Sequence, residues 1–145
     1  MADHLHKQIR DAVAALLTGL TTTGSRVYPN RLQPMADANL PGLRVFMDAE
    51  EVADSFLDKA QERRIDLIVE CCAKATTVLD DTLDASSKEV EVALSGGITL
   101  SGYWIDVQYG GMQFDDDLAD KPVGVKRLRF ALTYTAAGSA PDVLI

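Results

Sequence analysis

The first segment of the chain alternates apolar and polar residues with a helical period. Apolar side chains recur every three to four positions between residues 3 and 18, at Leu5, Ile9, Ala12, Val13, Leu16 and Leu17. This spacing is typical of one face of an amphipathic helix. Asp3 is a suitable N-cap, and Gly19 suits the position after the helix because glycine tolerates a left-handed backbone. We therefore predict a helix over residues 3–18.

A second helical stripe follows in the middle of the chain, at Leu79, Leu83, Val90 and Leu94. Thr77 with an aspartate three residues later resembles a capping box, in which two side chains bond the free N–H groups of the first turn. Residues 95–97, Ser-Gly-Gly, are a stop signal. These features predict a helix over residues 77–94.

Five other segments show the period of two that is typical of β-strands. We predict short strands at residues 27–28 and 43–47, and longer ones at 63–74, 103–109 and 123–135. The pair Gly110 and Gly111 predicts a bulge or bend. Residues 48–61 place a few apolar side chains among acids, which fits either a short helix or a long hairpin loop.

The strand at residues 63–74 has one fully apolar face, and Ile68 and Cys72 interrupt its polar face. We therefore expect that second face to be partly covered, either by the fold or by a partner. Alternation on the strands favours an antiparallel sheet with one face packed on the core. The predicted fold is α+β, a two-layer sandwich of a mostly antiparallel sheet with two main helices packed on one face.

A chain of 145 residues suits a single domain, which we place at residues 1–135. Small residues near the end predict a flexible C-terminal tail over residues 136–145. The formal net charge of −8 argues against non-specific electrostatic binding of DNA, which requires a basic surface. There is no run of about 18 apolar residues and no signal-peptide pattern, so we expect neither a membrane span nor secretion.

Candidate catalytic and metal-binding residues are few. Cys71 and Cys72 are adjacent and should point to opposite faces of a strand, which excludes a mutual disulfide. His4 and His6 are far from them in sequence, and we expect the two rings on different faces of the first helix. Residues 115–117, three aspartates, lack the spacing of a calcium loop, so we expect a solvated turn or a charged contact in an assembly. We predict no catalytic residue, no cofactor and no metal.

Several segments together resemble the tail terminator (tail completion, minor tail protein U-like) family of long-tailed bacteriophages. The resemblance runs from residue 9 to residue 134 and is carried by residues 14–20, 26–29, 40–46, 63–70, 79–84 and 128–134. It implies a structural virion protein with no enzymatic role, located at the neck end of the tail and assembled in the host cytoplasm.

The resemblance also implies a homo-oligomeric ring, usually a hexamer, that caps the tail tube and ends its polymerisation. The implied partners are the chain itself, the tail-tube protein and the head–tail connector, with no membrane. An acidic lumen would let DNA pass without specific binding. Two alternatives stay open: another neck protein, such as a head-completion or tail-tube subunit, and a small acidic metal-dependent hydrolase using residues 115–117.

The distribution of charge suggests where neighbouring subunits would meet. Acids dominate residues 48–58, whereas Arg127 and Arg129 lie on the last predicted strand. In a ring each subunit presents two different surfaces, and opposite charges on them would fix the register. We expect the edge with the two arginines to meet the acidic loop of the next subunit. The expected contacts of that loop are Asp54, Phe56, Leu57 and Asp58, with Phe56 as the apolar anchor.

Overall fold

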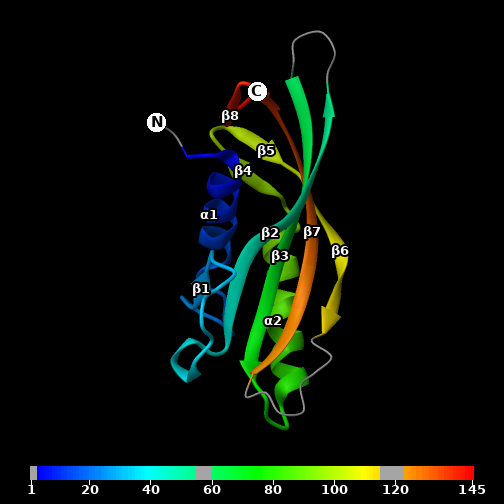
Figure 1. The fold of residues 1–145 in the computed structure, drawn as a ribbon. Helices are drawn as coiled ribbons and strands as arrows, with labels where there is room; N and C mark the ends of the chain where they lie inside the picture. Colours follow the sequence, from blue (N-terminus) through cyan, green and yellow to red (C-terminus); the bar gives the residue numbers. More distant parts are fainter. Residues whose placement is uncertain (1–2, 55–59, 115–122) are drawn as a thin grey trace.

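The computed structural model describes residues 3–54, 60–114 and 123–145 (Figure 1). Its elements, in chain order, are α1 (Leu5–Leu17), β1 (Val27–Tyr28), the 3-10 helix η1 (Asp37–Asn39), β2 (Gly42–Asp54), β3 (Ala60–Lys74), α2 (Leu79–Leu94), β4 (Ile98–Leu100), β5 (Tyr103–Ile105), β6 (Val107–Phe114), β7 (Val123–Ala137) and β8 (Ala140–Leu144).

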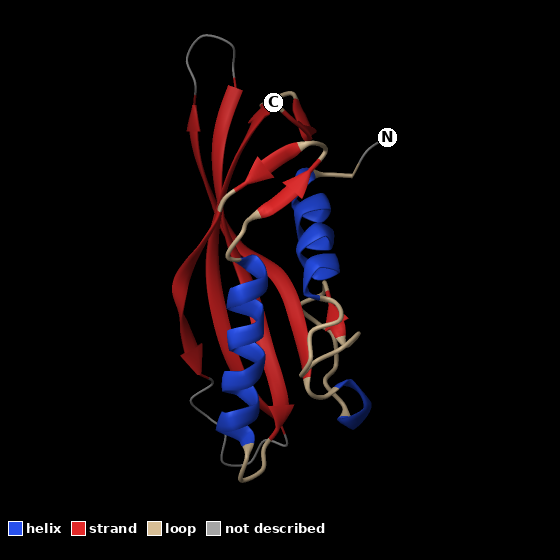
Figure 2. Cartoon of the chain, turned by 180° about the vertical axis from the view of Figure 1, so that it is seen from behind, coloured by secondary structure: helices blue, strands red, loops and turns tan. Residues whose placement is uncertain are grey.

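The elements form two layers. The main sheet has the order β1-β2-β3-β7-β6, and β8 pairs with the end of β7. Its pairings are antiparallel except for that of β1 with β2, which is parallel. Figure 2 shows both helices on the same face of this sheet, together with the small hairpin of β4 and β5. The predicted α+β sandwich with two helices on one face is therefore confirmed.

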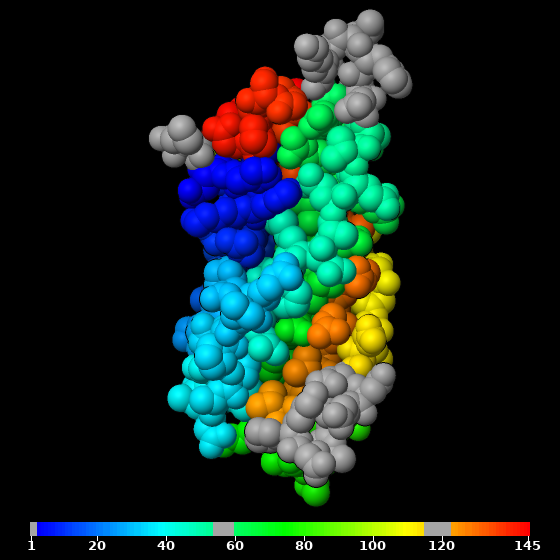
Figure 3. Space-filling view, viewed as in Figure 1, coloured from blue at the N-terminus to red at the C-terminus, as the bar shows by residue number. Residues whose placement is uncertain are grey.

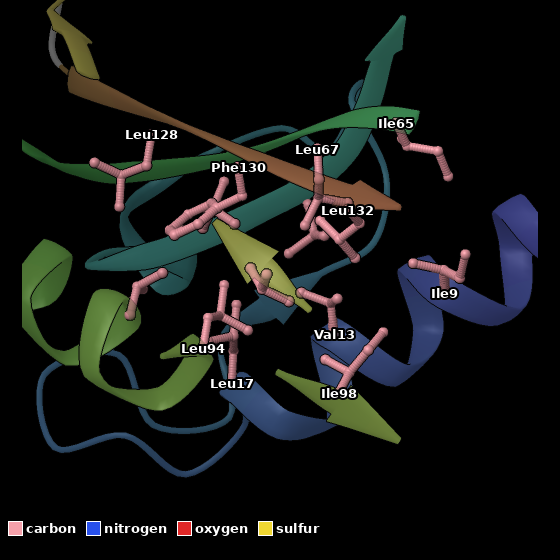
Figure 4. Packing of buried hydrophobic residues seen from close by; sticks show 14 of the residues in the cluster. Ile9, Val13, Leu17, Ile65, Leu67, Leu94, Ile98, Leu128, Phe130 and Leu132 are labelled. Carbon is pink, nitrogen blue, oxygen red and sulfur yellow. The ribbon is translucent and has the colours of Figure 1, made fainter. Parts of the chain in front are cut away.

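The hydrophobic core lies between the helices and the two central strands, β3 and β7. Alternate residues of these strands point toward the helices and are almost fully buried: Ile65, Leu67, Val69, Leu128, Phe130 and Leu132. The helices contribute Ile9, Val13, Leu17 and Leu94 to the same cluster (Figure 4). Because burying each such side chain contributes roughly 1.5–3 kcal/mol, this interface is the main source of stability.

The helix ends differ in part from the prediction. α1 is capped by His4, whose Nδ1 accepts a hydrogen bond of 3.0 Å from the backbone N–H of His6, so the expected Asp3 cap is wrong. Gly19 adopts a φ of +94°, as expected of the residue after the helix. α2 begins after Val78, which makes no capping hydrogen bond, so the predicted capping box at Thr77 is not formed.

Residues 48–61 contain no helix where the structure describes them. β2 continues to Asp54 and β3 begins at Ala60, and the two strands stay paired as far as Asp54 and Gln61. A bulge between Met47 and Ala49 shifts the alternation by one residue, which hid the strand pattern in the sequence. The long-hairpin alternative is thus the correct one, and its residues 55–59 lie outside the described residues.

The strand predicted at residues 103–109 is divided. β5 turns back to pair with β4, and β6 begins after Asp106 and pairs with β7. Ile105 and Val107 are both buried, so the alternation runs through the break and does not reveal it. The predicted bulge is confirmed, because the register shifts between Tyr109 and Met112.

The C-terminal residues also differ from the prediction. In place of a loose tail, β7 extends to Ala137 and β8 folds back against it. Ala136 and Leu144 are buried, and the side chain of Gln8 donates a hydrogen bond of 2.8 Å to the carbonyl oxygen of Asp142. Apolar residues in the last segment therefore join the core. Neither described helix is long and apolar enough to cross a membrane.

Candidate assembly surface

Neither α1 nor α2 packs on the other face of the sheet, which we call the open face (Figure 2). Figure 3 looks onto it and shows atoms of β2, β3, β7 and β6 at the surface. Its central positions carry charged side chains in register across three strands. Arg44 of β2 lies opposite Glu70 of β3, and Glu70 lies opposite Arg127 of β7. Glu70 therefore has a cationic neighbour on each side.

Glu70 is the centre of this arrangement and is only 5% exposed. Its Oε2 accepts hydrogen bonds from Nε and Nη2 of Arg127 at 3.0 and 2.7 Å. Its Oε1 lies 3.0 Å from Nε of Arg44, without the alignment of a hydrogen bond, so that pair is held by charge attraction. A buried carboxylate requires such partners, because an unpaired one would be expensive to desolvate.

Arg129 forms the second charged group of the open face. Its Nη1 lies 3.2 Å from a carboxylate oxygen of Asp48 and 3.2 Å from one of Asp66. It stands opposite Ile68, which is 1% exposed. Cys72, on the same face, is buried to the same extent. The fold therefore covers the two residues that interrupt the polar face.

The structure places the predicted interface residues as follows. Arg127 and Arg129 share the open face, but each is already paired with carboxylates of its own chain. Asp54 ends β2, whereas Phe56, Leu57 and Asp58 lie outside the described residues, as do residues 115–117. Asp54 is level with Ala136 across the sheet, and at about 3.3 Å per residue it lies roughly 23 Å from Arg129 and roughly 30 Å from Arg127. A contact between the two regions would thus join different chains.

The cysteines lie on opposite faces of β3, as predicted, and both are free thiols. Cys71 faces the helices as part of the core, and Cys72 faces the other way. Burial raises the pKa of Cys71 to about 12 and that of Cys72 to about 11. Since the thiolate is the reactive form, both side chains are chemically protected at neutral pH.

The two histidines are in contact, contrary to the prediction that they face apart. Their ring centroids are 4.0 Å apart, because His4 precedes the helix and does not follow its periodicity. Burial and the neighbouring His6 lower the pKa of His4. His6 Nε2 lies 2.5 Å from Oε2 of Glu50, which also accepts a hydrogen bond of 2.8 Å from the hydroxyl of Tyr134. This cluster ties α1 to β2 and β7.

The pKa of Glu50 reflects two opposing effects. Partial burial alone would raise it, but the hydrogen bonds from His6 and Tyr134 outweigh burial, so the pKa is lowered from its ordinary value of 4.5. Arg63 adds a longer-range attraction, with its Nη1 3.7 Å from the carboxylate. Glu50 is therefore held as a carboxylate.

Sequence reasoning missed a groove of about 610 Å³ beside β2. It is lined by His6, Arg10, Pro29, Asn30, Arg31, Phe46, Met47, Asp48, Ala49, Glu50 and Ile65. β1 pairs only with the beginning of β2, which leaves the later part of that strand free to form one wall. A signal was present in the sequence: His6 and Arg10, four residues apart, flank the apolar stripe of α1.

Residues 4–134 match the family described as phage minor tail protein U. The chain belongs to this family. It is therefore a structural protein of the phage tail and a component of the virion, and the resemblance found in the sequence is confirmed.

The fold of this minor tail protein U family member also occurs in a solved structure titled "Virion of native gene transfer agent (GTA) particle". The two chains share 20% sequence identity and superpose with a TM-score of 0.55 over 92% of each chain. At this identity the likeness shows a common fold. No curated protein matches the sequence.

The two edges of the sheet differ in this minor tail protein U family member. One edge carries the groove beside β2, and the other is β6, whose eight residues include no charged side chain. On β6, Tyr109 and Met112 are each 47% exposed. Exposed edge strands usually carry charges or proline that prevent pairing with another chain, and β6 carries only a bulge. The two edges of the sheet are therefore chemically different.

Proposed function

We propose that the chain assembles into a closed homo-oligomeric ring, most simply a hexamer, that caps the tail tube. Capping would end polymerisation of the tube and provide the joint to the head connector. The observation that carries the proposal is the family match over residues 4–134. Under this proposal the protein occupies the neck end of the tail.

The arrangement of the subunit's surfaces supports a ring. A ring requires two different, complementary surfaces on each subunit, because each subunit contacts its two neighbours through different sides. The groove beside β2 and the uncharged edge of β6 lie on opposite sides of the sheet. A subunit with two unlike edges can be joined head to tail, and a suitable rotation between neighbours closes the circle.

We use the word seam for the proposed contact between neighbouring subunits. One side of the seam includes the acidic segment with Asp54, Phe56, Leu57 and Asp58. Arg127 and Arg129 are candidates for the facing side. To receive the segment, the two arginines would have to exchange the carboxylates of their own chain for those of the neighbour. Such an exchange gains little, because one ion pair replaces another.

The proposed partners are further copies of the chain, the tail-tube protein and the head–tail connector. The net charge of −8 favours a lumen through which DNA passes without specific binding. We propose no catalytic role. The carboxylates that line the groove, Asp48 and Glu50, are both paired with arginines of the same chain, so neither is free to act as a nucleophile. The alternative hydrolase depends on residues 115–117, which lie outside the described residues.

The proposal is tested by adding the purified protein to growing tubes of the tail-tube protein. We expect tubes to stop growing at a length set by the time of addition, and negative-stain images to show a single extra ring at one end. A tail-tube subunit would instead extend the tubes, which separates the two roles. A heat-denatured sample and an unrelated acidic protein of similar size are the controls.

Two results would contradict the ring cap. The first is a strict monomer by light scattering both with and without tubes. The second is tube growth that continues unchanged at saturating protein. Binding of duplex DNA with a dissociation constant in the micromolar range at physiological salt, which is about the strength of good non-specific binders, would contradict the passive lumen.

A further inference from the structure

The groove beside β2 contains two cationic side chains for which the described residues supply no carboxylate partner. The Nε of Arg10 is buried and has no hydrogen-bond partner among the described residues. Arg31 donates a hydrogen bond to the carbonyl oxygen of Met47, and its guanidinium lies over the ring of Phe46, 5.0 Å from the centroid. The Arg10 side chain as a whole is partly exposed, so an anionic ligand in the groove would meet a guanidinium group that no described carboxylate neutralises.

The acids that line the same groove are already engaged. Asp48 is paired with Arg129. Glu50 is paired with Arg63 and bonded to His6 and to a tyrosine hydroxyl. Neither carboxylate is left to neutralise Arg10 or Arg31. Among the described residues, no carboxylate lies within ion-pair distance of Arg10 or Arg31, although the whole chain is strongly acidic and Asp48 shares Arg129 with Asp66.

The remaining lining is apolar. Pro29, Phe46, Met47 and Ile65 form part of the walls, next to the two arginines. A volume of about 610 Å³ is within the usual range for a site that holds several side chains. A ligand that fits must combine at least one carboxylate with a large apolar group, and an acidic peptide with an aromatic residue has this chemistry.

One segment of the chain has this composition. Residues 54–58 read Asp-Ser-Phe-Leu-Asp, with one acid at each end and an aromatic and an aliphatic residue between them. The segment joins β2 to β3, and β2 leads away from the groove toward it. In a head-to-tail ring every copy carries both a segment and a groove, so each contact uses one of each.

We propose that the groove of one subunit binds residues 54–58 of the neighbouring copy. Arg10 and Arg31 receive the two carboxylates, and Phe56 enters the apolar part. The inference rests on the proposed ring and names its seam. Compared with Arg127 and Arg129, the groove arginines need no exchange of partners, because no carboxylate of the described part of the chain is paired with them. Aromatic residues and arginines are also the residue types that most often dominate the binding energy of an interface.

A peptide of residues 52–60 tests the groove independently of ring formation. Its binding to the full-length protein is measured by fluorescence anisotropy, at a protein concentration where the chain is monomeric. We expect Arg10→Ala to weaken binding about tenfold or more, and the Phe56→Ala peptide to do the same. Lys7→Ala is the control, because Lys7 is a cation on the same helix that is paired with Asp3 and Asp11 and does not line the groove, and it should change binding less than about twofold. No measurable binding, or equal effects of Arg10→Ala and Lys7→Ala, would overturn the inference.

Mixing two variants tests the head-to-tail arrangement. Arg10→Glu damages the groove and leaves the segment intact, whereas Phe56→Ala does the reverse. Under conditions where the parent forms rings, each variant alone should stay monomeric. Their mixture should form dimers and stop there, because only one of the two possible contacts is intact. Circular dichroism checks that each variant is folded, and Arg10→Gln replaces Arg10→Glu if the charge reversal is not tolerated.

The outcomes separate this inference from the proposed function. If the parent and both variants all form rings on tubes, the ring stands and the proposed seam is wrong. If the parent forms no ring with or without tubes, the proposed function is wrong, and the peptide measurement alone decides whether the groove binds this segment. A mixture that closes into rings would contradict the head-to-tail seam.

Discussion

Replacement of Glu70 by alanine would leave two guanidinium groups facing each other without the carboxylate that they share. Arg44 and Arg127 both approach Glu70, at 3.0 Å and 2.7 Å, and stand on either side of it in the sheet. Glu70 is 5% exposed, and the side chain of Arg44 is also largely buried. Water therefore reaches the vacated site more easily from the side of Arg127, whose side chain is 40% exposed, than from that of Arg44, at 19%.

The size of the effect follows from this burial. Removal of one partner from a fully buried ion pair costs about 3–5 kcal/mol, because the other charge stays desolvated. Partial exposure of Arg127 lowers that cost, and we expect Glu70→Ala to reduce the free energy of unfolding by about 2–3 kcal/mol. For a chain of this length the melting temperature should fall by about 4–12 °C.

The measurement is urea unfolding of the isolated chain, followed by circular dichroism. Asp66→Ala is the matched control, since it removes a carboxylate from the same face, where Asp66 and Arg129 are 36% and 42% exposed. We expect the control to cost about 0.2–1 kcal/mol, which is usual for exposed pairs. A cost of Glu70→Ala no greater than that of the control would refute the reasoning, because burial would then not determine how much stability is lost when one partner of an ion pair is removed.

Three further predictions concern other sites. Gly97→Ala should lower the free energy of unfolding by about 1–3 kcal/mol in urea, because Gly97 has a φ of +76° and a Cβ would lie 2.6 Å from the carbonyl oxygen of Ile105. Cys71 and Cys72 should react with a thiol reagent only after unfolding, as absorbance would show. Glu50→Gln should destabilise the protein at neutral pH, and its deficit relative to the parent should shrink as the pH falls below 4.5, because the lowered pKa of Glu50 stabilises the fold only above that range.

The sequence predicted most of the layer structure because periodicity directly reports which side chains face the core. Alternation at Leu128, Phe130 and Leu132 predicted a half-buried strand, and the structure confirms it as β7. The pattern failed where it continued across a break or was shifted by a bulge. Ile105 and Val107 keep the alternation across the break between β5 and β6, and the bulge after Met47 hid the second half of β2.

The candidate site was less accessible from sequence, because it depends on which charges meet. Arg127 and Arg129 were found as basic residues on an open face, but nothing local to them indicated that Glu70, Asp48 and Asp66 are their partners. Those partners lie on β2 and β3, more than fifty positions earlier in the chain. Pairing across strands is set by sheet register, and register requires the whole sheet.

The sequence by itself determined the fold class and the family, since both depend on the order and periodicity of elements along the chain. Only the tertiary structure decided which cations are neutralised and which are left free. Arg10 and Arg129 are the same residue type in the sequence. In the structure, Arg10 lines a groove and its buried Nε has no described partner, whereas Arg129 lies between two aspartates. The difference arises because ion pairing is a short-range interaction between side chains that folding alone brings together.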